Sequence, residues 1–152
     1  MPFDLSPTDA HSFYTGLRQF NQGEYYACHD TLEALWMEAP IPEKPFFQGI
    51  LQLAVALYHL GNHNWQGAAI LLGEGSRRLE PFEPSYHRVD VTDLLDCADA
   101  WLETVQQLGP ERVTDLATAL KQIQQGQAGP GETATLPRWE IRYAEEAPQT
   151  TN

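Results

Sequence analysis

The chain has 152 residues, an apolar fraction of 42% and a formal net charge of −12 at pH 7. A chain of this length can bury a single core without a disulfide or a metal, and its apolar content is ordinary for a globular protein. Its 21 acidic and nine basic residues repel phosphate backbones and anionic lipid, which disfavours nucleic acid and membrane as partners. We therefore expect a soluble domain whose partner is an unknown protein or a small molecule, with a homo-oligomer left open.

Three features favour a cytoplasmic location. The two cysteines, Cys28 and Cys97, lie far apart in the sequence, as is typical of a reducing compartment. The first residues lack the positive and apolar segments of a signal peptide. Residues 45–73 carry no charge, but the polar stretch 59–64 divides them into two pieces, each shorter than the roughly 20 residues that cross a bilayer.

The N-terminal half predicts two helical hairpins. Ser6-Pro7-Thr8-Asp9 combines a cap residue, a proline and an acid, which indicates the start of a helix over about 7–22. A second helix over about 24–38 ends at Pro40-Ile41-Pro42. The third, about 43–60, is apolar nearly all round and is expected to be the buried centre of the bundle. After a turn at Gly61-Asn62, a fourth helix covers about 63–79.

The C-terminal half predicts two more helices and a tail. Capping and apolar spacing place a fifth helix over about 90–109 and a sixth over 110–126. The fold class is therefore all-α, a compact bundle of about six helices in residues 1–126, followed by a linker and tail in 127–152. Residues 126–137 look flexible, 139–143 alternate as an extended segment does, and the residues that follow are expected to be disordered.

The two hairpins carry a faint internal repeat of about 38 residues. In each copy an aromatic residue precedes a glycine turn and a helix with a small residue at the crossing, which resembles a tetratricopeptide unit. Two copies are too few for an open solenoid, so a closed bundle is favoured. Gly49 and Gly67 are read as places where neighbouring helices approach closely.

Polar side chains on the second and third helices form two stripes at helical spacing. The set comprises Tyr25, His29, Glu33 and Trp36 on one helix and Gln48, Gln52 and His59 on the next. If the stripes face each other, these side chains converge into a buried polar cluster.

Three interpretations of this cluster stay open. The favoured one is structural: the histidines, Glu33 and Gln52 bond to one another and fix the register of the helices. The second makes His29, Glu33 and His59 the ligands of a divalent metal in a hydrolase-like enzyme. The third is a metal-free active site in which His29 orients Glu33 as a general base. The sequence alone leaves enzymatic activity uncertain.

Residues 12–80 also carry a family resemblance. The runs FNQGEYYACHDTLEALW and FQGILQLAVALYHLGNHNWQGA contain H-x-x-x-E-x-x-W as His29, Glu33 and Trp36. They resemble the bacterial and archaeal family called domain of unknown function 309, except that Asp30 stands where a glutamate is expected. The resemblance implies a small helical bundle and implies no activity.

The sequence therefore favours an uncharacterised cytoplasmic protein that acts as a binding or scaffolding module, with the metal-dependent enzyme as the alternative. A weaker third hypothesis is an adaptor that uses the tetratricopeptide-like groove and an exposed aromatic tail around Trp139.

Overall fold

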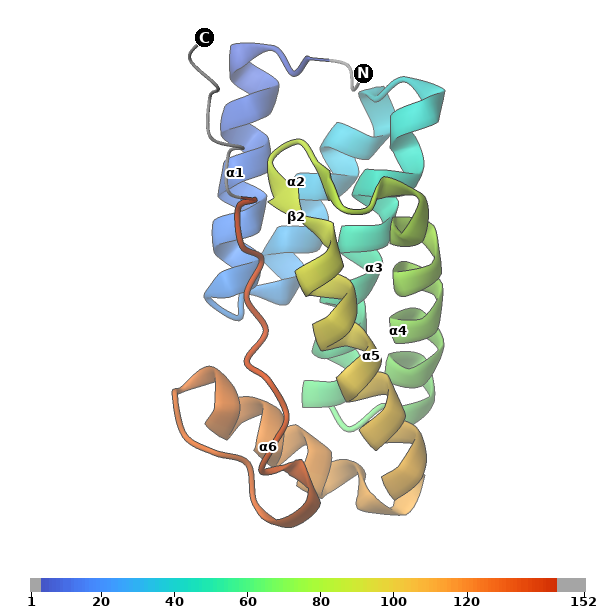
Figure 1. Cartoon of the computed structure of the whole chain (residues 1–152), viewed down its shortest axis with the longest axis vertical. Helices are drawn as coiled ribbons and strands as arrows, with labels where there is room; N and C mark the ends of the chain where they lie inside the picture. Colours follow the sequence, from blue (N-terminus) through green and yellow to red (C-terminus); the bar gives the residue numbers. More distant parts are fainter. Residues whose placement is uncertain (1–3, 145–152) are drawn as a thin grey trace, which may run out of the picture.

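The computed structural model describes residues 4–144, which contain six α-helices and one two-stranded antiparallel sheet (Figure 1). The helices are α1 (Pro7–Asn21), α2 (Tyr25–Glu38), α3 (Lys44–Gly61), α4 (Trp65–Leu79), α5 (Val91–Leu108) and α6 (Val113–Gln124), and the strands are β1 (Ser85–Tyr86) and β2 (Val89–Asp90). Short 3-10 helices occupy Ile41–Glu43, Glu80–Phe82, Pro110–Arg112 and Gly131–Thr133. The all-α class and the number of helices are confirmed.

Helix α3 lies at the centre of the bundle, as its apolar composition predicts. It packs between α2 and α4 and also contacts α6. Ten of its 18 residues are buried, so its neighbours cover several faces. The helices α1 and α2 form one antiparallel hairpin, and α3 and α4 form the other (Figure 1).

Glycines allow the closest helix crossings. A Cβ atom added to Gly49 would lie 2.6 Å from Leu79 Cγ, and one added to Gly75 would lie 2.9 Å from the carbonyl oxygen of Gly49. The backbones of α3 and α4 therefore approach where both helices lack a side chain. The close approach predicted at Gly49 is confirmed, whereas an added Cβ at Gly67 would meet the side chains of Asn64 and His59 in the preceding turn.

The sixth helix crosses the end of the bundle formed by the two hairpin turns (Figure 1). It contacts α3 and is joined to α5 by Gly109, whose φ of +76° suits glycine, and by a 3-10 turn. Helix α4 begins two residues later than predicted, because His63 adopts a left-handed φ of +62° and Asn64 caps the helix by accepting a hydrogen bond from the Gly67 amide.

The segment after α6 is part of the core, which corrects two expectations. Trp139 has 0% and Ile141 2% of its surface exposed, so Trp139 does not offer the exposed aromatic contact that the adaptor hypothesis required. Residues 126–137 were expected to be a flexible linker, yet they include a 3-10 turn, and Thr133 within them is buried. The disorder expected at the end of the tail concerns residues 145–152, which lie outside the described residues.

Side-chain amides bind the backbone of the extended segment in the way that a neighbouring β-strand would. Asn21 accepts a hydrogen bond from the Ile141 amide at 2.6 Å and donates one to the Ile141 carbonyl at 3.1 Å. Gln124 makes the same pair of bonds with Trp139, at 2.7 and 3.0 Å. Because alternate residues bond this way, their side chains point into the core, and the segment then bridges to β2 through Val89 and Tyr143.

Candidate functional site

His29 and Glu33 lie side by side on the surface of α2. His29 Nε2 lies 3.1 Å from Glu33 Oε2, and its Nδ1 lies 3.3 Å from Asp30 Oδ1. The side chains of His29 and Glu33 are 23% and 49% exposed. The prediction that these two residues share a face is confirmed, but the pair does not lie in a buried network.

The polar residues of α3 form no hydrogen bond with His29 or Glu33 within residues 4–144 and have other partners. Gln52 is buried and donates a weak hydrogen bond of 3.4 Å to Glu74 on α4, while its carbonyl oxygen has no partner among residues 4–144. His59 lies in the last turn of α3, and its Nδ1 lies 3.3 Å from the side-chain nitrogen of Asn64. Gln48 is half-buried. The expected convergence of the two stripes is therefore absent from the described residues.

Aromatic rings separate the two histidines of the proposed metal site. Ring contacts run from His29 to Tyr26, from Tyr26 to Tyr58, and from Tyr58 to His59, with centroid distances of 5.8, 5.3 and 6.2 Å. Within residues 4–144, no three His, Cys, Asp or Glu side chains are grouped as a metal site requires. The set His29, Glu33 and His59 is thus not assembled, although His29 and Glu33 lie side by side.

Trp36 has a packing role. The Lys44 ammonium lies 4.8 Å from the centroid of the Trp36 ring and donates hydrogen bonds to the carbonyl oxygens of Trp36 and Met37 at 2.6 and 3.1 Å. These contacts close the C-terminal end of α2 onto the start of α3. The indole nitrogen of Trp36 is buried without a partner among the described residues.

The most buried charged contact was missed by the sequence analysis. Glu43, 1% exposed, accepts hydrogen bonds from His87 Nε2 at 2.5 Å and from the Tyr86 hydroxyl at 3.2 Å. The His87 ring packs against the rings of Phe13, Phe46 and Phe47. The one sequence signal for this contact was an acidic residue directly before a long apolar helix. Its pairing with residue 87 could not be predicted, because nothing local in the sequence brings residue 87 to residue 43.

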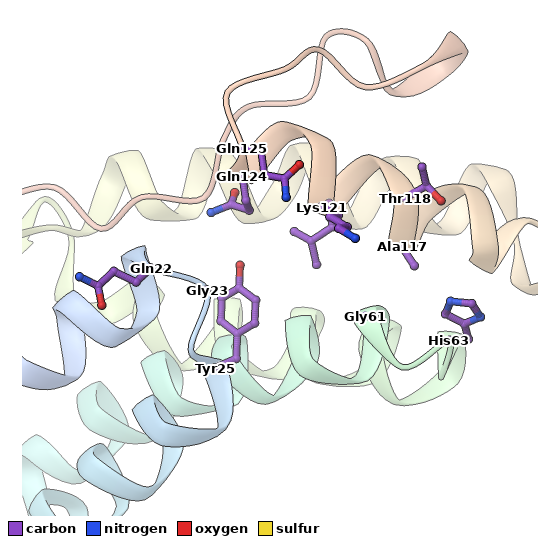
Figure 2. A pocket seen from close by; sticks show the side chains of 11 residues that line it. Gln22, Gly23, Tyr25, Gly61, His63, Ala117, Thr118, Lys121, Gln124 and Gln125 are labelled. Carbon is purple, nitrogen blue, oxygen red and sulfur yellow. The ribbon is translucent and has the colours of Figure 1, made fainter.

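The largest cavity that we describe lies elsewhere, at the end of the bundle beneath α6. It has a volume of about 480 Å³ and is open to solvent on one side. Figure 2 shows its two walls, one from α6 and the other from the two hairpin turns. We call it the hairpin-end cleft, and its lining consists of Gln22, Gly23, Tyr25, Gly61, His63, Ala117, Thr118, Leu120, Lys121, Gln124 and Gln125.

Tyr25 is the one member of the predicted polar set that lines this cleft. Only 9% of the residue is exposed, and its ring packs edge-on against Phe20. Its hydroxyl is directed towards α6 (Figure 2) and has no hydrogen-bond partner among residues 4–144. Burial raises the pKa of this hydroxyl well above its ordinary value, so it stays protonated and can donate a hydrogen bond.

Three helix ends meet at the cleft, and all three end in the same way. The residue after each C-cap is left-handed, with φ of +79° at Gly23, +62° at His63 and +87° at Gly126. In each case the next amide donates a hydrogen bond to the carbonyl five residues earlier, in the bonds Glu24 to Gln19, Asn64 to His59 and Gln127 to Gln122. These are Schellman caps, which satisfy carbonyl groups in the last turn of each helix.

The cleft carries no acidic side chain, although the chain as a whole is strongly acidic. None of its eleven lining residues is Asp or Glu, and Lys121 is its one lysine or arginine. The Lys121 side chain is exposed and has no hydrogen-bond or ion-pair partner within the described range 4–144. The lining therefore combines amide and hydroxyl groups with one unpaired cation.

No helix in residues 4–144 is both long enough and apolar enough to cross a membrane. The uncharacterized protein YpuF of Bacillus subtilis (strain 168) is 41% identical to this chain over 58 residues, which cover 38% of this chain and 33% of YpuF. The chain thus matches about a third of the length of this relative. No solved structure gives a significant match.

The family comparison covers the two hairpins. The matched segment begins in α1 and ends within α4, so it contains both hairpin turns and Tyr25 but not α6. The resemblance inferred from the sequence is confirmed: residues 13–71 match the family described as Domain of unknown function (DUF309).

Proposed function

We propose that this protein is a binding module that holds a small molecule in the hairpin-end cleft. The observation that carries the proposal is the Tyr25 hydroxyl, which is buried at the cleft without a hydrogen-bond partner. A buried hydroxyl without a partner costs about 1–3 kcal/mol. A ligand that accepts a hydrogen bond from this hydroxyl would remove that cost.

The shape and lining of the cleft support the same function. Ligand sites are typically concave, with volumes of about 300–1,000 Å³, and combine apolar walls with a few polar groups. The hairpin-end cleft has about 480 Å³, apolar surface from Ala117 and Leu120, and side-chain amides from Gln22 and Gln125. The hydroxyl of Tyr25 is covered by protein, so a ligand reaches it when a neighbouring side chain moves.

The cleft favours a binding role over the other hypotheses. His29 and Glu33 lie outside its lining, so neither contributes a catalytic group there. The adaptor hypothesis needed an exposed aromatic tail around Trp139, and Trp139 is instead buried in the core. Both cysteines are buried and unpaired, which supports the cytoplasm as the compartment that we propose.

Thermal unfolding with a panel of polar metabolites tests the proposal. A compound that binds the folded protein raises its Tm by mass action. We expect hits to stabilise the wild type, and to stabilise Tyr25→Phe less because the phenylalanine lacks the hydroxyl. Without ligand, Tyr25→Phe should be at least as stable as the wild type, since it removes an unpaired buried polar group.

Tyr58→Phe is the matched control, because Tyr58 is 42% exposed and does not line the cleft. This variant should keep the full ligand-dependent rise in Tm. Hits that stabilise wild type and Tyr25→Phe equally would contradict binding at Tyr25. A panel in which no compound stabilises the wild type would contradict the binding function itself.

A further inference from the structure

We infer that the ligand of the hairpin-end cleft is a small organic anion, which His63 and Lys121 recognise at the mouth of the cleft. This inference rests on the proposed binding function and adds the chemical class of the ligand and the residues that select it. Three independent observations point to it: a strained backbone position, the distribution of charge, and the arrangement of hydrogen-bond donors.

The strained position is His63. Its φ of +62° places it in the left-handed region, which residues with a Cβ atom enter at a cost. The equivalent residue in the α1–α2 turn is Gly23, and the equivalent residue after α6 is Gly126. The same Schellman cap is thus formed three times at this end of the bundle, twice with glycine and once with histidine. Stability alone favours glycine at this position, so stability does not explain the presence of a histidine. The histidine lines the cleft, where its imidazole can contact a ligand.

The charge distribution identifies the kind of ligand. The chain has 21 acidic and nine basic residues, yet the cleft is lined by Lys121 and His63 and by no carboxylate. A cationic ligand would find no counter-charge in this lining. An anion would find the ammonium group of Lys121, which has no ion-pair partner among the described residues, at the rim.

The donors extend across the cleft. The Tyr25 hydroxyl lies at the inner wall and, being protonated, seeks an acceptor. The side-chain amides of Gln22 and Gln125 and the hydroxyl of Thr118 also line the space. Leu120 and Ala117 supply apolar wall area. The complementary molecule has an apolar body and a carboxylate or a similar oxyanion, which accepts hydrogen bonds and carries the negative charge.

Three probes of similar shape and different charge test this inference: naphthoate, naphthamide and naphthylmethylammonium. Their dissociation constants would be measured by titration while the amide resonances of the full chain are followed. We expect naphthoate to bind with shifts centred on residues 22–25, 61–63 and 117–125, and to bind about threefold to tenfold more tightly than naphthamide. The ammonium probe should bind more weakly than either.

Two variants test the named residues. Lys121→Gln should reduce the preference for naphthoate over naphthamide about threefold or more. His63→Gly should weaken naphthoate binding while raising Tm by about 1–3 °C, since relief of the left-handed strain exceeds the entropic cost of a glycine. A merely structural histidine would show the rise in Tm without the loss of binding. His11→Asn removes an exposed imidazole from α1, outside the cleft lining, and should change neither quantity.

The possible failures are distinguishable. Equal or tighter binding of the neutral or cationic probe at the same resonances would overturn the anion preference and leave the binding function standing. Unchanged naphthoate affinity in both His63→Gly and Lys121→Gln would overturn the roles of these residues. If no probe shifted a resonance of the cleft, the proposed function and the inference would fall together.

Discussion

The substitution Gly75→Ala tests the close crossing of α3 and α4. A Cβ atom there would lie 2.9 Å from the carbonyl oxygen of Gly49 and 3.1 Å from two side-chain atoms of Leu53. The carbonyl belongs to helix α3 and cannot yield without moving the helix. Gly73, two residues earlier in α4, is the matched control, because its nearest neighbour would be Leu102 Cδ2 at 3.9 Å.

The two substitutions share one energetic contribution and differ in the other. Replacing a helical glycine with alanine is favourable by about 0.5–1 kcal/mol, because glycine loses more backbone entropy on folding. Overpacking at a closed crossing costs about 1–3 kcal/mol. We therefore expect Gly73→Ala to be stabilised by about 0.5–1 kcal/mol and to exceed Gly75→Ala by about 1–3 kcal/mol in the free energy of unfolding.

Urea denaturation followed by tryptophan fluorescence measures both variants. The difference should appear in the midpoint at an unchanged slope, which shows that the native and unfolded states expose the same surface. In thermal unfolding it should correspond to about 2–4 °C for each kcal/mol. Equal stability of Gly75→Ala and Gly73→Ala would refute the reasoning, because it would mean that α3 and α4 do not approach at Gly49.

Three further predictions concern other parts of the molecule. His29→Ala should lower the free energy of unfolding by less than about 1 kcal/mol, because its contact with Glu33 is at the surface; a loss above about 2 kcal/mol in urea would instead support a buried network. Glu43→Ala should cost about 3 kcal/mol, since it removes a buried carboxylate that binds the partly buried side chains of His87 and Tyr86, and Glu33→Ala, at an exposed site, should differ little from the wild type. Burial raises the pKa of the Cys28 and Cys97 thiols to about 12, so iodoacetamide at about pH 8 should label them only as fast as the chain unfolds; rapid labelling of the native protein would contradict their burial.

The sequence by itself determined the helices, because their signals are local. Apolar residues at helical spacing, cap residues and glycine or proline stops set the bounds of α1, α2 and α3 to within a residue or two. The central position of α3 also followed from its own composition. The pairing of His29 with Glu33 could be predicted for the same reason, since residues four apart on a helix are neighbours.

Tertiary structure decided which polar residues meet. Whether Gln52 and His59 faced α2 depended on the rotation of α3 against its neighbours, which no spacing along one helix specifies. The same holds for Glu43 and His87, which are 44 positions apart. The tail shows the limit most clearly. The alternation of apolar and polar residues correctly indicated an extended segment. Its burial, however, depends on the side-chain amides of Asn21, which is far away in the sequence, and of Gln124, which lies on the other side of a turn. The hairpin-end cleft arises in the same way, because it exists only where α6 crosses two hairpin turns, and contacts between distant segments leave no periodic pattern in the sequence.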